Sequence, residues 1–97
     1  MLNERQKRHL RGLGHALKPV VQTGNAGLSE AVLAEIEGAL AHHELIKIRL
    51  VAADRDERDA MIAAVGERCQ AELVQRVGHM ALFYRPNPKK KRRIELP

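Results

Sequence analysis

One segment, residues 18–30, constrains the fold of this chain more than any other, because it predicts a strand, a glycine loop and a helix start in immediate succession. Two valines after Pro19 favour a strand, and proline suits the first position or an edge. Gly24 and Gly27 follow in the spacing G-x-x-G. Glycine permits positive φ and leaves no Cβ to hold a ligand away from the backbone.

A loop of this kind before a helix aims backbone N–H groups and the positive end of the helix dipole outward. Gly24, Asn25, Ala26 and Gly27 are therefore candidate contacts for a phosphate, and Lys18 just upstream adds a positive charge. The alternative is a purely structural turn, because two glycines at this spacing connect many strands to helices.

Charge is concentrated at the two ends of the chain. Residues 1–18 and residues 89–97 each carry five Lys/Arg against one Glu, whereas residues 19–88 carry seven against ten acidic residues. Such asymmetry favours a polyanionic partner, most often nucleic acid, over a merely solubilising surface. Phe83 and Tyr84 are the two aromatic residues. Domains that stack RNA bases on several aromatics are thus disfavoured, and contacts to phosphates and sugar hydroxyls are expected.

The length and composition predict a single globular domain. The chain has 97 residues, of which 44% are hydrophobic and 30% charged. No apolar run approaches the ~20 residues of a membrane helix, and the first residues lack the apolar core of a signal peptide. A single cysteine excludes an internal disulfide. We expect a cytoplasmic monomer without cofactor, metal or membrane partner.

A first helix is predicted over residues 3–17. Leu10, Leu13 and Leu17 fall on one side at helical spacing, which we expect to pack on the domain. The opposite side carries a basic ridge that consists of Lys7, Arg8, Arg11 and His15. Two glycines weaken the helix near its end, so an early end is expected.

The middle of the chain predicts a strand over residues 19–23, a helix over residues 28–43 and a strand over residues 45–52. Ser29 is the expected N-cap of the helix. His43 lies on the apolar face of the helix and is interpreted as a core histidine. In the second strand Ile46, Ile48 and Leu50 form the buried set, and Lys47 and Arg49 project from the other face.

The last part predicts a helix capped by Asp54 and two strands, residues 73–77 and 80–85. The apolar stripe of the helix is Met61, Ile62, Val65 and Cys69, so the cysteine is interpreted as a core residue. Gly78-His79 fits a two-residue hairpin turn.

The chain after Pro86 changes in composition. A basic tail, residues 87–97, is expected to be mobile. It contains Lys89, Lys90, Lys91, Arg92 and Arg93, while Ile94 and Leu96 either dock on the domain or remain free.

The predicted fold class is α/β: an N-terminal helix, then β-α-β-α-β-β, forming an α+β two-layer sandwich with a mixed four-stranded sheet. Two strands joined through a helix should run parallel, and the final hairpin is antiparallel. The domain spans residues 1–86.

Several motifs together resemble the CRM domain (chloroplast RNA splicing and ribosome maturation), and the size resembles the bacterial stand-alone YhbY-type protein. They are Leu17-Lys18-Pro19-Val20-Val21, Gly24-Asn25-Ala26-Gly27-Leu28, Glu35-Ile36, His43-Glu44-Leu45-Ile46-Lys47-Ile48 and Leu82-Phe83-Tyr84-Arg85-Pro86. The resemblance implies a fold like the C-terminal domain of translation initiation factor three and RNA contacts at the glycine loop and the basic surface beside it. For the bacterial form it implies association with precursors of the large ribosomal subunit.

These observations lead to four hypotheses. The first is a non-enzymatic RNA-binding protein that binds ribosomal RNA in large-subunit (pre-50S) precursors. Its principal contacts would be the glycine loop, Lys7, Arg8, Arg11 and Lys18. Lys47 and Arg49 would be second-line contacts, and the tail would add general affinity. The alternatives are a general module for tRNA or mRNA and a protein-interaction adaptor that uses the basic ends. An enzyme ranks last, because no nucleophile, paired carboxylates or metal spacing is evident.

Overall fold

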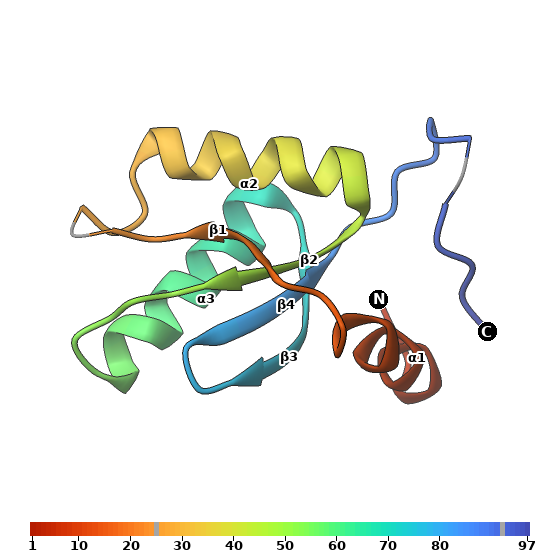
Figure 1. The fold of residues 1–97 in the computed structure, drawn as a ribbon, viewed down its shortest axis with the longest axis horizontal. Helices are drawn as coiled ribbons and strands as arrows, with labels where there is room; N and C mark the ends of the chain where they lie inside the picture. Colours follow the sequence, from red (N-terminus) through yellow and green to blue (C-terminus); the bar gives the residue numbers. More distant parts are fainter. Residues whose placement is uncertain (25, 92) are drawn as a thin grey trace.

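The computed structural model describes residues 1–24, 26–91 and 93–97 of the chain (Figure 1). The elements follow the predicted order. They are α1 (Glu4–Gly14), β1 (Pro19–Gln22), α2 (Glu30–His43), β2 (Leu45–Arg49), α3 (Arg55–Cys69), β3 (Glu72–Val77) and β4 (Met80–Tyr84). Among the described residues, no helix is both long and apolar enough to cross a membrane.

The four strands form one mixed sheet in the order β1-β2-β4-β3. β1 runs parallel to β2, while β4 is antiparallel to both of its neighbours. β2 and β3 therefore point the same way, as expected of strands joined through a helix, but β4 lies between them. The predicted mixed four-stranded sheet is confirmed.

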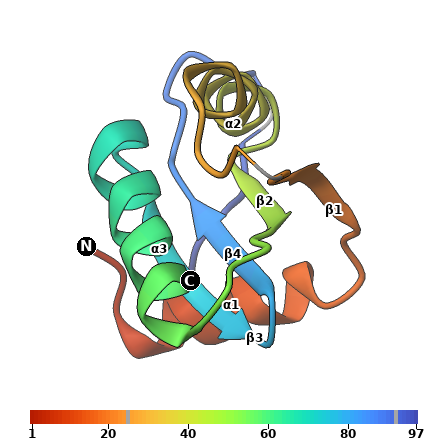
Figure 2. The same ribbon diagram turned by 90° about the vertical axis from the view of Figure 1, so that its left-hand side faces the viewer.

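Helices lie on both faces of the sheet (Figure 2). α2 and α3 cover one face, where the larger core cluster includes Ile36, Ile46, Val65 and Phe83. α1 crosses the opposite face, where Leu10 packs in a smaller cluster with residues from β2, β3 and β4. The second cluster explains why Leu45 is buried as well as the predicted Ile46, since both faces of β2 are covered at its start.

Local capping and turn predictions are confirmed. The side chain of Ser29 accepts the N–H of Val32, and that of Asp54 accepts the N–H of Glu57. These two residues are the N-caps of α2 and α3. Gly78 has φ +57° at the first position of the β3–β4 turn, as a tight hairpin with glycine first requires.

The predicted apolar side of the first helix is confirmed at Leu10 and wrong at Leu13 and Leu17. Leu13 and Leu17 are 43% and 38% exposed, whereas Leu10 and Gly14 are buried. The helix approaches the sheet through a glycine: a Cβ on Gly14 would lie 2.5 Å from Cδ2 of Leu82. With Gly14 against the sheet, Leu13 faces away from it. The helix ends at Gly14, before Leu17, which agrees with the early end expected from its two glycines.

His43 is also misassigned, because it is exposed and the next residue is buried. Glu44 is fully buried and has φ +65° at the C-cap of α2. The left-handed backbone turns the chain directly from α2 into β2, so the buried position falls one residue after the predicted one.

Candidate nucleic-acid interface

The glycine loop closes on itself through a backbone hydrogen bond. The N–H of Gly27 donates to the carbonyl oxygen of Gly24 at 3.0 Å, and Gly27 has φ +67°. A Cβ on either glycine would meet no atom within 4 Å, so both border open space. The Gly27 N–H is therefore already hydrogen-bonded within the loop, so it is not free to donate to a ligand. Asn25 lies outside the described residues.

Thr23 fixes the base of this loop to the neighbouring connection. Its side chain is buried, and its hydroxyl accepts the N–H of Val51 at 2.8 Å. Its own N–H donates to the carbonyl oxygen of Arg49 at 3.0 Å. Sequence reasoning did not single out Thr23, because a threonine at the end of a strand has no distinctive signal. Its role depends on the neighbouring strand.

The acidic residue that follows the loop is directed toward α3. Glu30 forms a salt bridge with Arg68 at 3.0 Å, and both side chains are largely exposed. This hydrogen bond, with the attraction of the Glu30 charge, raises the pKa of Arg68. The pair is screened by solvent, but it partly neutralises the carboxylate closest in sequence to the loop.

The sheet face that α1 only partly covers carries the predicted cations of β2. Lys47 is half-buried and Arg49 is exposed, and both side chains lie on this face because their neighbours Ile46 and Ile48 point into the larger core. Arg49 is paired with Gln22 of β1, one residue before Thr23. The two cations therefore lie along the strand that leads to the base of the glycine loop.

α1 lies on the same face, but at the end where the tail docks, because Gln6 donates to the carbonyl oxygen of Pro97 (Figure 1). Arg8 of α1 is exposed, and Lys7 and Arg11 are half-buried. Lys18 lies in the connection between α1 and β1 and is exposed. His15, which follows α1, lines a hollow together with Lys47 and other residues of the sheet. The outer surfaces of α2 and α3 differ, because they include exposed carboxylates, among them Glu35, Glu37, Asp59 and Glu67.

The basic tail lies against the body of the protein at the opposite end from the glycine loop (Figure 1). Glu44 holds it: one carboxylate oxygen accepts the N–H of Asn87 at 2.6 Å, and the other accepts the N–H of Ile94 at 2.8 Å. Ile94 and Leu96 pack against the smaller core cluster. Sequence reasoning left this docking open and missed Glu44, because its partners are about 40 to 50 residues away.

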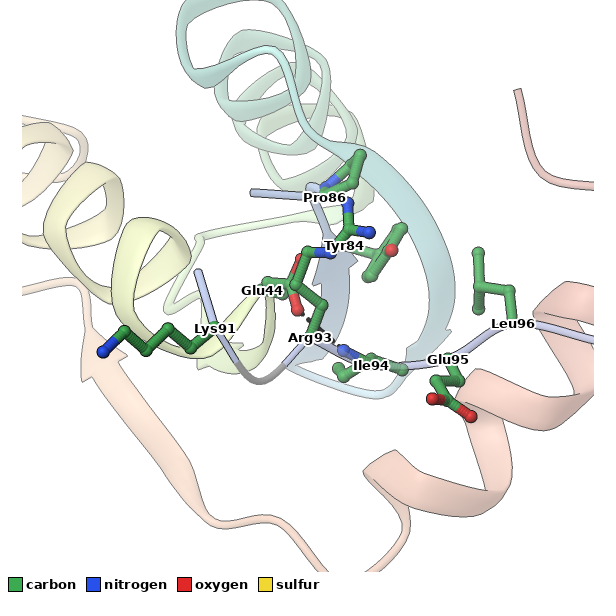
Figure 3. Close-up of a pocket in the computed structure, with 8 residues that line it drawn as sticks. All are labelled: Glu44, Tyr84, Pro86, Lys91, Arg93, Ile94, Glu95 and Leu96. Carbon is green, nitrogen blue, oxygen red and sulfur yellow. Dashed lines mark hydrogen bonds between the residues drawn. The ribbon is translucent and has the colours of Figure 1, made fainter. Parts of the chain in front are cut away.

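Between the tail and the body lies an open cavity of about 570 Å³ (Figure 3). It is bordered by Glu44, Tyr84, Arg93 and Glu95, among others. Burial, followed by the charge of Glu44, raises the pKa of Tyr84. The carboxylates of Glu44 and Glu95 balance the cations Lys91 and Arg93 in the lining, and most of the lining belongs to the tail, so we assign the cavity to the docking of the tail.

Of the tail cations, Arg93 lies beside Glu44 at the edge of this cavity (Figure 3). Lys89, Lys91 and Arg93 are exposed, and the ammonium group of the half-buried Lys90 donates to the carbonyl oxygen of His42. Arg92 lies outside the described residues. The predicted contact residues therefore lie in three places: the loop at one end, Lys47 and Arg49 along β2, and α1 with the tail at the other end (Figure 1).

Cys69 lies in the larger core, as predicted, and is almost fully buried. Burial, followed by the nearby charge of Glu37, raises the pKa of its thiol. A raised pKa leaves less thiolate at neutral pH, which suits a packing role.

Fold and charge together define a class: a small α/β domain whose sheet carries two helices on one face and, on the other, a basic surface that continues to a glycine loop. Residues 2–85 match the family model of the CRS1 / YhbY (CRM) domain. The chain belongs to this family, which confirms the resemblance drawn from its motifs.

Relatives of full length support the assignment. The chain is 48% identical over 96 residues to a Haemophilus influenzae protein named "RNA-binding protein", covering 99% of this chain and 95% of that one. It is 48% identical over 88 residues to "Probable RNA-binding protein PA4753" of Pseudomonas aeruginosa, covering 91% and 85%. The solution structure of the Staphylococcus aureus protein SAV1595 superposes with a TM-score of 0.84 at 36% identity and full coverage of both chains.

Proposed function

We propose that this chain is an RNA-binding protein that contacts the backbone of structured RNA through the glycine loop, α1 and β2. The observation that carries the proposal is the location of Lys47 and Arg49 on one face of β2, the strand that leads to the base of the glycine loop. Cations on one face neutralise phosphates and release counterions, which drives binding to RNA. The names of the relatives agree with this proposal.

The RNA that we propose is large-subunit ribosomal RNA within pre-50S precursors, where the protein assists assembly in the cytoplasm as a monomer without catalysis. Family resemblance supports this choice. Phosphate contacts position a protein without reading sequence, so most of the affinity would follow the shape of the folded RNA.

Ultraviolet crosslinking in cells, followed by sequencing of the attached RNA, tests the proposal. We expect reads to accumulate at a few sites in large-subunit ribosomal RNA, especially in unprocessed forms. Reads spread over tRNA or mRNA would retain RNA binding and reject the role in assembly. No RNA above background, together with protein partners that survive nuclease treatment, would instead support the adaptor hypothesis.

A further inference from the structure

A small hollow in the uncovered part of the sheet has a chemistry that phosphate binding does not explain. It measures about 240 Å³ and is lined by His15, Lys47, Gln75, Val77, Met80 and Leu82. Typical pockets for small ligands measure roughly 300–1,000 Å³. The hollow is therefore suited to one part of a polymer rather than to a complete small substrate.

The hollow is built on two rows of residues that run across the sheet. In the first row Lys47 is paired with Leu82, and Leu82 with Gln75. In the second row Arg49 is paired with Met80, and Met80 with Val77. Paired side chains on one face lie about 5 Å apart. Each row thus places a cation on one side, an apolar residue in the middle and the edge strand β3 on the other side.

α1 covers the first row and leaves the second row open. Gly14 lies directly over Leu82, where even a Cβ would approach to 2.5 Å. The next residue, His15, is exposed and forms one wall of the hollow. In the second row Val77 is 62% exposed. An apolar floor is therefore accessible between the end of a helix and two cations.

The charge of the hollow distinguishes it from other hollows of the protein. Its described lining contains a lysine and a histidine and no carboxylate. Three other hollows formed by described residues each include a carboxylate: Glu44 in one, Glu72 in another and Glu30 in the third. An anionic ligand with an apolar part is therefore most compatible with the hollow on the sheet.

We propose that this hollow binds the base of one unpaired RNA nucleotide, with its phosphate at Lys47 and Arg49. The base lies on Met80 and Val77, and the His15 imidazole is placed to stack on it, as aromatic and histidine rings do in RNA recognition. The amide of Gln75 offers both a donor and an acceptor to the edge of the base. The inference rests on the proposed RNA binding and adds selection of a base, which phosphate contacts cannot provide.

Nuclear magnetic resonance of the full chain tests the proposal with the four nucleoside 5′-monophosphates as probes, and with ribose 5-phosphate as a ligand without a base. We expect saturable shifts of the Gln75 side-chain amide and the Met80 methyl group with the nucleotides, and at least a threefold preference among them. Ribose 5-phosphate should leave both signals in place. Gln75→Ala should reduce the preference to less than twofold.

Gln22→Ala is the matched control, because Gln22 is also an exposed strand glutamine but lies on β1, beyond Arg49 from the hollow. It should retain the preference. Equal shifts with all five probes, or loss of the preference in the control, would overturn the proposal. A structured RNA hairpin is titrated into the same samples: hairpin binding without base-dependent shifts rejects only the hollow, whereas no hairpin binding rejects the proposed function itself.

Discussion

The two cation-rich ends of the molecule hold their charges in different ways. At the loop end, Lys47 and Arg49 lie on β2, which pairs with β1 on one side and β4 on the other, and Thr23 connects the loop to the chain after β2. At the tail end, the cations follow one another along a segment whose described residues form no helix or strand. The carboxylate of Glu44 accepts two backbone N–H groups of the tail.

This difference leads us to expect different contributions to binding. Charges on paired strands keep their spacing, so they can match the phosphates of one particular RNA shape. Charges on a segment outside the sheet are not fixed in spacing by strand pairing, so we expect them to add affinity without selection. The mobility expected of the tail stays a prediction, and its anchor at Glu44 indicates how to measure it.

The largest effect on binding is expected from Gly27→Asp. The new carboxylate would face phosphates, and φ of +67° strains any residue other than glycine. We expect RNA affinity to fall more than thirtyfold, about 2 kcal/mol, in a protein that remains folded by circular dichroism. Gly38→Asp on α2 is the control, since a Cβ there meets no atom within 4 Å. Equal losses in both variants would refute the assignment of the loop.

Glu44→Gln tests the tail anchor with little change in shape. The glutamine side chain has one oxygen where the carboxylate has two, so one of the two backbone N–H groups would face the NH2 group instead of an acceptor. We expect this to cost about 1–3 kcal/mol in the free energy of unfolding. Chemical denaturation measures this loss, and amide relaxation should show increased motion at Ile94. An unchanged order parameter at Ile94 would mean that the carboxylate does not hold the tail.

Thr23→Val makes the corresponding change at the loop end. Valine fills the same space but leaves the N–H of Val51 without its acceptor, so we expect a loss of about 1–2 kcal/mol in the free energy of unfolding. RNA affinity should fall as well, because the base of the loop loosens. If stability fell and affinity did not, the position of the loop would not depend on this anchor.

Two glycines of α1 should respond to alanine with opposite signs. A Cβ on Gly12 would meet no atom within 4 Å, so Gly12→Ala should stabilise the helix by up to about 1 kcal/mol. Gly14→Ala places its Cβ against Leu82 and should cost about 1 kcal/mol after the gain in helix propensity. Thermal denaturation of both variants measures the difference, and stabilisation by both would show that α1 can shift freely on the sheet.

The smallest effect is expected from replacing Lys89, Lys91 and Arg93 together by glutamine. This variant keeps both N–H groups that donate to Glu44, whereas a deletion of residues 89–97 would remove that of Ile94. At physiological salt we expect affinity to fall less than tenfold and by the same factor for unrelated RNAs. Each lost phosphate contact should also lower the salt dependence by about 0.7–0.9. A loss confined to one RNA would give the tail a specific role.

Local chemistry was enough to predict much of this protein. Periodicity, capping and glycine turns are properties of neighbouring residues, so the element order, the Ser29 and Asp54 caps and the Gly78 turn could all be predicted. The family resemblance likewise followed from short motifs. The buried set of β2 was predicted because residues alternate between the two faces of a strand.

Packing between distant segments decided the rest. Gly14 packs against Leu82, Thr23 accepts the N–H of Val51, and Glu44 accepts N–H groups of the tail. The residues of each pair are far apart in sequence. A helical pattern cannot reveal that a glycine rather than a leucine meets the sheet. Nor can a helical pattern show that Glu44 is buried while it accepts hydrogen bonds from distant backbone N–H groups. The hollow beside His15 exists because β4 lies between β2 and β3, an order that depends on the whole sheet.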